Sequence, residues 1–212
     1  MSTAQDRDAT YPEKPAATEH AVHTLIAERW SPRLFEKRQI EPEKIASLLE
    51  AARWAPSSLN EQPWRYLVWD GSDSEAREKA NSCLAHGNTW ALEAPLLMLS
   101  AASGTFARNG KPNRHGQHDV GLASENLVLQ AVALGLAAHQ MAGYDEDKAR
   151  ELFNIPEDFT PMAMIAVGYP FRGDLESIPE DAQKRELAER TRKPLPEIAF
   201  DGTWARGYGI RS

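Results

Sequence analysis

Residues 120–136 are the segment that most constrains how this chain of 212 residues can fold. Almost every face of a helix drawn through them is apolar, which exceeds the single stripe that an amphipathic surface helix needs. The bulky members are Leu122, Leu127, Leu129, Val132 and Leu134. We therefore expect a helix that is covered on most sides, at the centre of a subunit or of a dimer interface, with Asp119 as its N-terminal cap.

The rest of the chain alternates between helical and extended patterns. Apolar positions spaced by three and four predict helices over residues 20–29, 42–55, 74–84, 146–153 and 180–190. Apolar and β-branched runs predict strands over residues 64–69, 96–100 and 162–167. The first two strands are expected to be neighbours, and His139 is expected at the end of a further strand. Together these elements predict one α+β domain over residues 19–212.

Three segments lack a core pattern. Residues 1–18 mix charged, small and proline residues without periodicity, so we expect a flexible N-terminal tail. Residues 103–117 are crowded with Gly, Asn, Pro and charged residues, which is typical of a loop or mobile flap. Residues 171–212 are mostly polar and interrupted by prolines, so they are expected to pack on another surface, with a partner subunit as the nearest candidate.

Charge and cysteine content exclude several classes of protein. There are 24 Lys and Arg residues against 31 Asp and Glu, a net charge of −7, which argues against general binding to nucleic acid or anionic membranes. The single Cys83 can form no internal disulfide and is predicted to be a buried apolar residue, so the cytoplasm is the default location. We expect neither a secretory signal nor a membrane span, because no apolar run has the required length.

The first cluster of chemically useful residues is Arg29-Trp30-Ser31-Pro32-Arg33. Two guanidinium groups four residues apart, with a hydroxyl between them, can bind one anion such as a phosphate. The simpler interpretation is a solvated helix end.

The second cluster lies between two prolines, where a helix passes into a strand. Its polar side chains are Ser57, Ser58, Asn60 and Gln62, between Pro56 and Pro63. The prolines restrict the backbone, and the amides can both donate and accept hydrogen bonds, which suits the edge of a heterocycle. Ser and Asn are also common in ordinary turns, so this alternative stays open.

Both clusters, in this order, resemble the motifs of the FMN-dependent nitroreductase superfamily. The likeness continues through residues 119–135, Gly143-Tyr144, Ile155-Pro156, Gly168-Tyr169-Pro170 and residues 190–194. It thus covers nearly everything after residue 20. The resemblance implies a central, mostly antiparallel sheet flanked by helices, in an intertwined homodimer with an extended C-terminal arm.

The resemblance also implies roles for individual residues. Arg29, Trp30, Ser31 and Arg33 match positions that bind FMN, with Arg33 toward N1 and O2 of the ring. Arg190 and Arg192 match the late basic pair that completes the phosphate site. Met141, Ala142 and Gly143 match a strand end along the flavin edge, with the Gly143 N–H near N5. Pro56, Ser57, Ser58, Asn60 and Gln62 match positions that reach the flavin of the other subunit.

The implied activity is hydride transfer from NADH or NADPH through flavin N5 to a small electron-poor acceptor, by a ping-pong mechanism. The acceptor classes are nitroaromatics, quinones and activated alkenes, and no side chain need act as a catalytic acid. The alternatives are reductive dehalogenation, fragmentation of the flavin, or FMN binding without catalysis. A metal site at His115, His118 and Asp119 is not expected, because no fourth ligand is evident.

Overall fold

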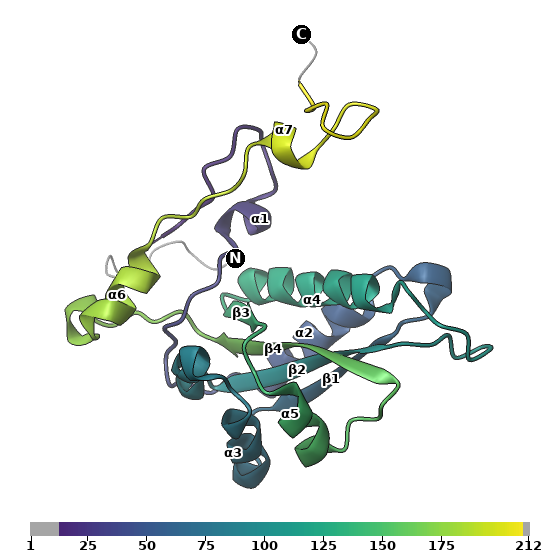
Figure 1. The fold of residues 1–212 in the computed structure, drawn as a ribbon. Coiled ribbons are helices and arrows are strands. Elements are labelled where there is room, and N and C mark those ends of the chain that lie inside the picture. The colour runs from purple at the N-terminus through teal and green to yellow at the C-terminus, as the bar shows by residue number, and fades with distance from the viewer. Residues whose placement is uncertain (1–12, 210–212) are drawn as a thin grey trace.

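A computed structural model describes residues 13–209, which fold around one four-stranded sheet (Figure 1). The strands are β1 (Trp64–Trp69), β2 (Leu96–Ser103), β3 (Ala137–Met141) and β4 (Phe159–Gly168), in the order β1-β2-β4-β3. Every neighbouring pair is antiparallel, which confirms the expected α+β fold and the pairing of the two first strands. The strands β2 and β4 are longer than predicted, because pairing with each other extends both beyond their most apolar residues.

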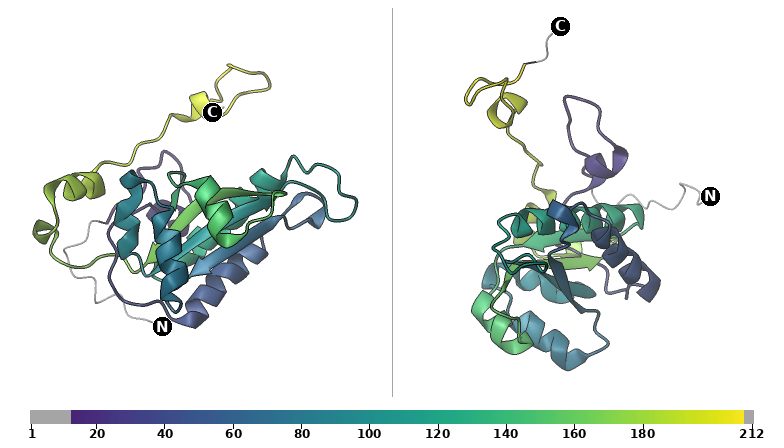
Figure 2. Two further views of the ribbon diagram at one scale, coloured as in Figure 1. Left: turned by 60° about the horizontal axis from the view of Figure 1, so that its bottom comes forward. Right: turned by 90° about the vertical axis from the view of Figure 1, so that its right-hand side faces the viewer.

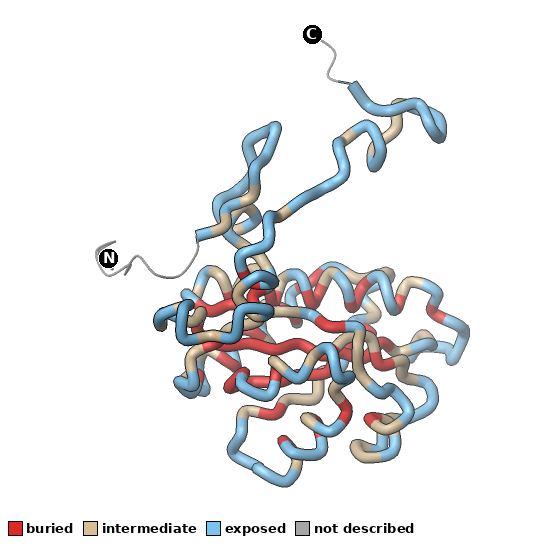
Figure 3. The backbone as a smooth tube through the Cα atoms, turned by 60° about the vertical axis from the view of Figure 1, so that its left-hand side comes forward, coloured by how far each residue is buried: buried red, intermediate tan, exposed pale blue. Residues whose placement is uncertain are grey.

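Helices cover both faces of the sheet (Figures 1 and 2). The helices α2 (Pro42–Arg53) and α4 (Gly116–Ala133) pack on one face. The other face carries α3 (Ser74–Ser82), the 3-10 helix η2 (His86–Glu93) and α5 (Glu146–Phe153). Side chains of a strand alternate between faces, and in β2 Leu96 belongs to the first core and Leu97 to the second. The middle of the sheet is therefore buried on both sides (Figure 3).

Helix α4 is only partly covered within one chain. Its inner residues, including Val120, Leu127 and Val128, are buried against the sheet and α2. Leu122 and Leu129 are half-buried instead. A single subunit thus leaves part of the apolar surface of this helix open to solvent.

The start of α4 differs from the prediction. The helix begins at Gly116, and Asp119 lies inside it rather than capping it. A Cβ on Gly116 would lie 2.4 Å from the carbonyl oxygen of Ser103, so only glycine permits the helix to begin so close to β2. The expected flap over residues 103–117 is consequently shorter, and Thr105 and Pro112 form an isolated β-bridge within it.

The outer helices are also shorter than predicted. Helix α1 covers Thr24–Glu28 rather than residues 20–29: Leu25 is half-buried, but Ile26 is 51% exposed, and Val22 lies before the helix and is 45% exposed. Helix α6 covers Glu180–Leu187 rather than residues 180–190. Three short turns, η1 (Ser58–Asn60), η3 (Leu175–Ser177) and α7 (Leu195–Ile198), complete the elements. No helix between residues 13 and 209 is long and apolar enough to cross a membrane.

The C-terminal segment projects from the body of the chain. After α6, residues 188–209 run away from the sheet (Figures 1 and 2). Their end is closed on itself by a β-bridge between Phe200 and Gly207, and Trp204 there is 85% exposed. The first twelve residues of the predicted tail lie outside the described part. In the part that is described, Ala16 N–H donates to the carbonyl of Ala27 at 2.8 Å.

Arg77 joins α3 to the ends of two strands. Its side chain is buried, and its guanidinium donates to the carbonyls of Ala94 at 2.6 Å, Pro95 at 3.3 Å and Trp69 at 3.3 Å. Its Nε also donates to the amide oxygen of Asn81 at 2.9 Å. Arg77 therefore satisfies carbonyl groups at the end of β1 and in the two residues that join η2 to β2.

We predict that Arg77→Met lowers the free energy of unfolding by about 2 to 4 kcal/mol, because several buried acceptors lose their donor. Urea denaturation would measure the change. The matched control is Lys79→Met on the same helix, which is expected to change it by less than about 0.5 kcal/mol because Lys79 only pairs with the exposed Glu75. A cost for Arg77→Met no larger than that of the control would contradict this role.

Candidate functional site

The segment of residues 29–33 is fixed beside the edge strand β3. His139 Nδ1 lies 2.9 Å from the carbonyl oxygen of Pro32, and since a carbonyl only accepts, Nδ1 carries the proton. The N–H of Arg33 donates to a carboxylate oxygen of the buried Glu186 at 2.9 Å. The sheet and α6 together set the position of this segment.

Arg190 lies against the same segment. Its guanidinium donates to the carbonyls of Ala27 at 2.9 Å and Arg29 at 2.8 Å, and also to that of Lys14. Burial lowers the pKa of Arg190, and the positive charges of Arg29 and Arg192 lower it further. The structure thus brings together Arg29, Arg190 and Arg192, which sequence analysis had assigned to one site.

We call Lys14, Arg29, Arg33, Arg190 and Arg192 the basic cluster. These residues come from three distant segments of a chain whose net charge is −7. The guanidinium of Arg29 also lies 3.3 Å from the hydroxyl of Ser31, so a hydroxyl donor accompanies the cations. Like charges held near one another repel, and an anion bound among them would remove the repulsion.

The end of β3 provides a backbone donor. Gly143 follows Met141 and Ala142, and its carbonyl accepts bonds from Asn88 Nδ2 at 2.8 Å and from Ala85 N–H at 3.1 Å. A Cβ on Gly143 would lie 2.7 Å from Asn88 Nδ2, so a side chain here would displace that bond. Within residues 13–209 the Gly143 N–H has no acceptor, which leaves it available to a ligand.

The turn between Pro56 and Gln62 is stiff. Leu59, Asn60 and Gln62 have left-handed backbones, with φ of 56°, 57° and 53°. The hydroxyl of Ser57 accepts from Gln62 N–H at 3.0 Å. The Ser58 N–H donates to Asp119 at 3.0 Å, which explains why that carboxylate is buried within α4. The side chains of Asn60 and Gln62 remain exposed.

One chain does not bring this turn to the basic cluster. The turn precedes the edge strand β1, and the Pro63 carbonyl accepts from Ser103, whose partner on β4 is Phe159. The basic cluster lies at the other edge strand, where His139 pairs with Ala166. Phe159 and Ala166 are separated along β4 by about 23 Å at roughly 3.3 Å per residue. The two motifs therefore lie at diagonal corners of the sheet.

Three residues beside the predicted site residues were not predicted from the sequence. They are Lys14, which was expected in a loose tail, and two residues of η2: Asn88, which bonds Gly143, and Trp90, which contacts His139. The ring of Trp90 lies 4.5 Å from that of His139, and its buried Nε1–H has no partner among the described residues. No periodic signal marks these positions. Clustered cations, a free backbone donor and a buried unpaired indole N–H fit a ring cofactor that bears a phosphate.

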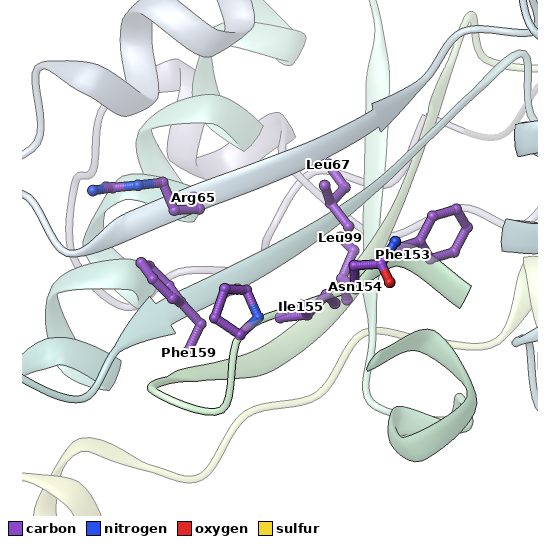
Figure 4. Close-up of a pocket in the computed structure, with 9 residues that line it drawn as sticks. Arg65, Leu67, Leu99, Phe153, Asn154, Ile155 and Phe159 are labelled. Atoms are coloured by element: carbon purple, nitrogen blue, oxygen red, sulfur yellow. The ribbon is translucent and has the colours of Figure 1, made fainter. Parts of the chain in front are cut away.

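A cavity of about 290 Å³ lies elsewhere, on the α5 face of the sheet (Figure 4). It is lined by Arg65, Leu67, Leu99, Phe153, Ile155 and Phe159, among others. None of the predicted site residues lines it. Residues 13–209 also contain no group of three His, Cys, Asp or Glu side chains that could bind a metal ion.

Comparison with known proteins identifies the family of the chain. The sequence profile of the nitroreductase family matches residues 26–169. A relative from Archaeoglobus fulgidus, provisionally named NADH dehydrogenase/NAD(P)H nitroreductase, is 30% identical over 154 residues, which cover 69% of this chain and 83% of the relative.

Two solved structures share the fold. One, described as an oxidoreductase containing FMN, superposes with a TM-score of 0.81 at 33% identity and covers 88% of this chain and 94% of its own. The other, a Desulfovibrio desulfuricans protein provisionally described as a nitroreductase in complex with FMN, has a TM-score of 0.66 at 26% identity, with coverages of 88% and 99%. The chain belongs to the nitroreductase family.

Proposed function

We propose that this protein is an FMN-dependent oxidoreductase that transfers hydride from NADH or NADPH to a small electron-poor acceptor. Nitroaromatics, quinones and activated alkenes are the acceptor classes. The observation that carries the proposal is the basic cluster, which gathers five cations beside the end of β3. The cytoplasm is the proposed location.

In this proposal the chain binds and orients, and the cofactor supplies the redox chemistry. When bound, FMN would accept hydride from the nicotinamide and release it to the acceptor, with the two substrates entering in turn. Arg29, Ser31 and Arg192 would bind the phosphate, while Arg190 positions Arg29 through its carbonyl. Arg33, whose N–H is fixed on Glu186, would supply positive charge where electrons arrive. The Gly143 N–H would donate to the ring.

We further infer that two copies build each site. The turn of residues 56–62 lies too far from the basic cluster of its own chain, so a second copy would bring it there. Two features support this inference: Leu129 on α4 is only half-buried within one chain, and Leu59 in the turn itself is 64% exposed.

The loop of residues 104–115 is the proposed cover that selects the acceptor. Its Ala107 N–H donates to the carboxylate of Glu61 at 2.6 Å, which ties the loop to the turn. If the turn reaches the partner's cofactor, this loop reaches the same opening.

His139 would keep residues 29–33 in place as a neutral side chain. Burial lowers its pKa from the usual 6.5, and the charges of Arg33 and Arg29 lower it further, while the bond to the Pro32 carbonyl opposes this shift. A neutral His139 can hold the Pro32 carbonyl without adding another positive charge to the cluster.

Replacing Arg29 and Arg192 together by alanine is predicted to give colourless protein. The phosphate would lose two charge-assisted contacts of about 1.5 to 3 kcal/mol each. The absorbance of bound flavin after purification measures occupancy. The matched control is Arg185→Ala, which removes an exposed arginine paired with Asp181 and should leave occupancy unchanged. Full occupancy of the double variant would refute the assignment of the phosphate site.

Mixed dimers test the shared site. One subunit would carry Arg29→Ala and Arg192→Ala, and its differently tagged partner Asn60→Ala and Gln62→Ala. If each site takes the cations from one chain and the turn from the other, both defects fall in one site and the second site is intact. We expect mixed dimers to bind about half the flavin of wild-type dimers and to oxidise NAD(P)H. Dimers made of either variant alone should neither bind flavin nor oxidise NAD(P)H. Purified mixed dimers with no recovery would place the whole site within one chain.

The pH dependence of stability should report on His139. The pKa of His139 is lower in the folded chain than in the unfolded chain. The contribution of neutral His139 to the free energy of unfolding is therefore fully present above about pH 6.5 and is lost as the pH falls toward the pKa of the folded chain. His139→Gln retains a donor for the Pro32 carbonyl but does not titrate. Between about pH 7.5 and about pH 5.5 the wild type should lose more unfolding free energy than this variant. Equal losses would show that His139 is not held neutral by the fold.

A further inference from the structure

Residues 13–16, which we call the N-terminal strap, lie between two segments that build the basic cluster. Ala16 N–H donates to the carbonyl of Ala27 at 2.8 Å, which joins the strap to the segment before Arg29. Lys14 Nζ donates to the carbonyl of Glu186 at 2.7 Å and also to that of Ala188, which joins it to the segment before Arg190. The strap is therefore bonded on both sides.

The bonds between the strap and the C-terminal segment are reciprocal. Lys14 donates from its side chain to that segment, and its carbonyl accepts from the guanidinium of Arg190. The same guanidinium bonds the carbonyls of Ala27 and Arg29. Loss of the strap would remove one of the three acceptors that fix Arg190, and with it part of the support for Arg29.

Lys14 is itself a member of the basic cluster. Its ammonium lies 4.5 Å from the centre of the Trp30 ring, next to the segment that carries Arg29 and Arg33. Burial lowers the pKa of Lys14, the carboxylate of Glu186 raises it, and the charges of Arg190 and Arg33 lower it again. An anion among these cations would favour the charged form of Lys14 and the closed strap together.

We propose that Lys14 is a positioning residue for the phosphate of FMN, and that the N-terminal strap closes the phosphate site by locking Arg190 and Arg29 into place. This inference rests on the proposed function. The effect of the strap is expected at the phosphate end of the ligand, because its carbonyl bonds Arg190, which in turn bonds the Arg29 carbonyl, and no bond to Gly143 or to residues 56–62 is found among the described residues. The affinity for riboflavin, which lacks the phosphate, should therefore not depend on the strap.

The test compares the binding of FMN and riboflavin to the flavin-free full-length protein, followed by quenching of flavin fluorescence. Lys14→Met should raise the Kd for FMN about tenfold and change that for riboflavin less than about twofold. Lys14→Arg, which keeps the charge and the donors, should restore most of the FMN affinity. The matched control is Lys184→Met, because Lys184 is an exposed lysine of the neighbouring α6 that pairs with Glu180.

A second variant separates position from charge. Ala16→Pro removes the N–H that bonds the Ala27 carbonyl but leaves Lys14 charged. This variant should raise the Kd for FMN several-fold and leave that for riboflavin unchanged. If Lys14→Met does not fold, Ala16→Pro tests the proposal without it.

Three results would overturn the inference. They are an unchanged FMN affinity in Lys14→Met, an equal loss for both ligands, and an Ala16→Pro variant with wild-type FMN affinity. Wild-type protein that binds neither flavin would instead overturn the proposed function itself, so the two failures are distinguishable.

Discussion

Repulsion among cations is the constraint on which the site of this protein depends. Three backbone carbonyls accept bonds from Arg190, and two accept bonds from Lys14. The dipoles of these carbonyls therefore stabilise the two cations close to each other. The buried carboxylate of Glu186 adds a fixed negative charge at the N–H of Arg33. Carbonyls hold cations in place without cancelling their charge. The cluster therefore keeps a positive potential that a phosphate can use.

The geometry of the sheet is the reason that the proposed site needs a second subunit. Its two edge strands hold the basic cluster and the turn of residues 56–62 at opposite corners, and both are fixed by hydrogen bonds to the core. Neither can move to the other without breaking those bonds. In the composite site that we propose, the rigidity of each subunit is what makes assembly, rather than closure of a loop, the step that completes the pocket.

Much of the fold could be predicted from sequence, because its strands and inner helices have clear patterns. Strand β1 and helix α5 have the predicted bounds, and all four strands lie where apolar runs or strand ends were expected. Errors arose where contacts distant in sequence decide the outcome. Gly116 can begin α4 against the carbonyl of Ser103 because it has no Cβ, a contact that the helical pattern of the sequence does not reveal. Lys14 was missed for the same reason, since its carbonyl bonds a residue 176 positions away.

The long separation between the parts of the basic cluster also determines when it can exist. Lys14 and residues 29–33 leave the ribosome early, but Arg190 and Arg192 are made near the end of synthesis. The sheet can begin to form from residues 64–168 while the phosphate site still lacks its last cations. In the proposed site, loading of the cofactor would then follow translation, and the nascent chain would pass through a stage that is largely folded but still unable to retain flavin.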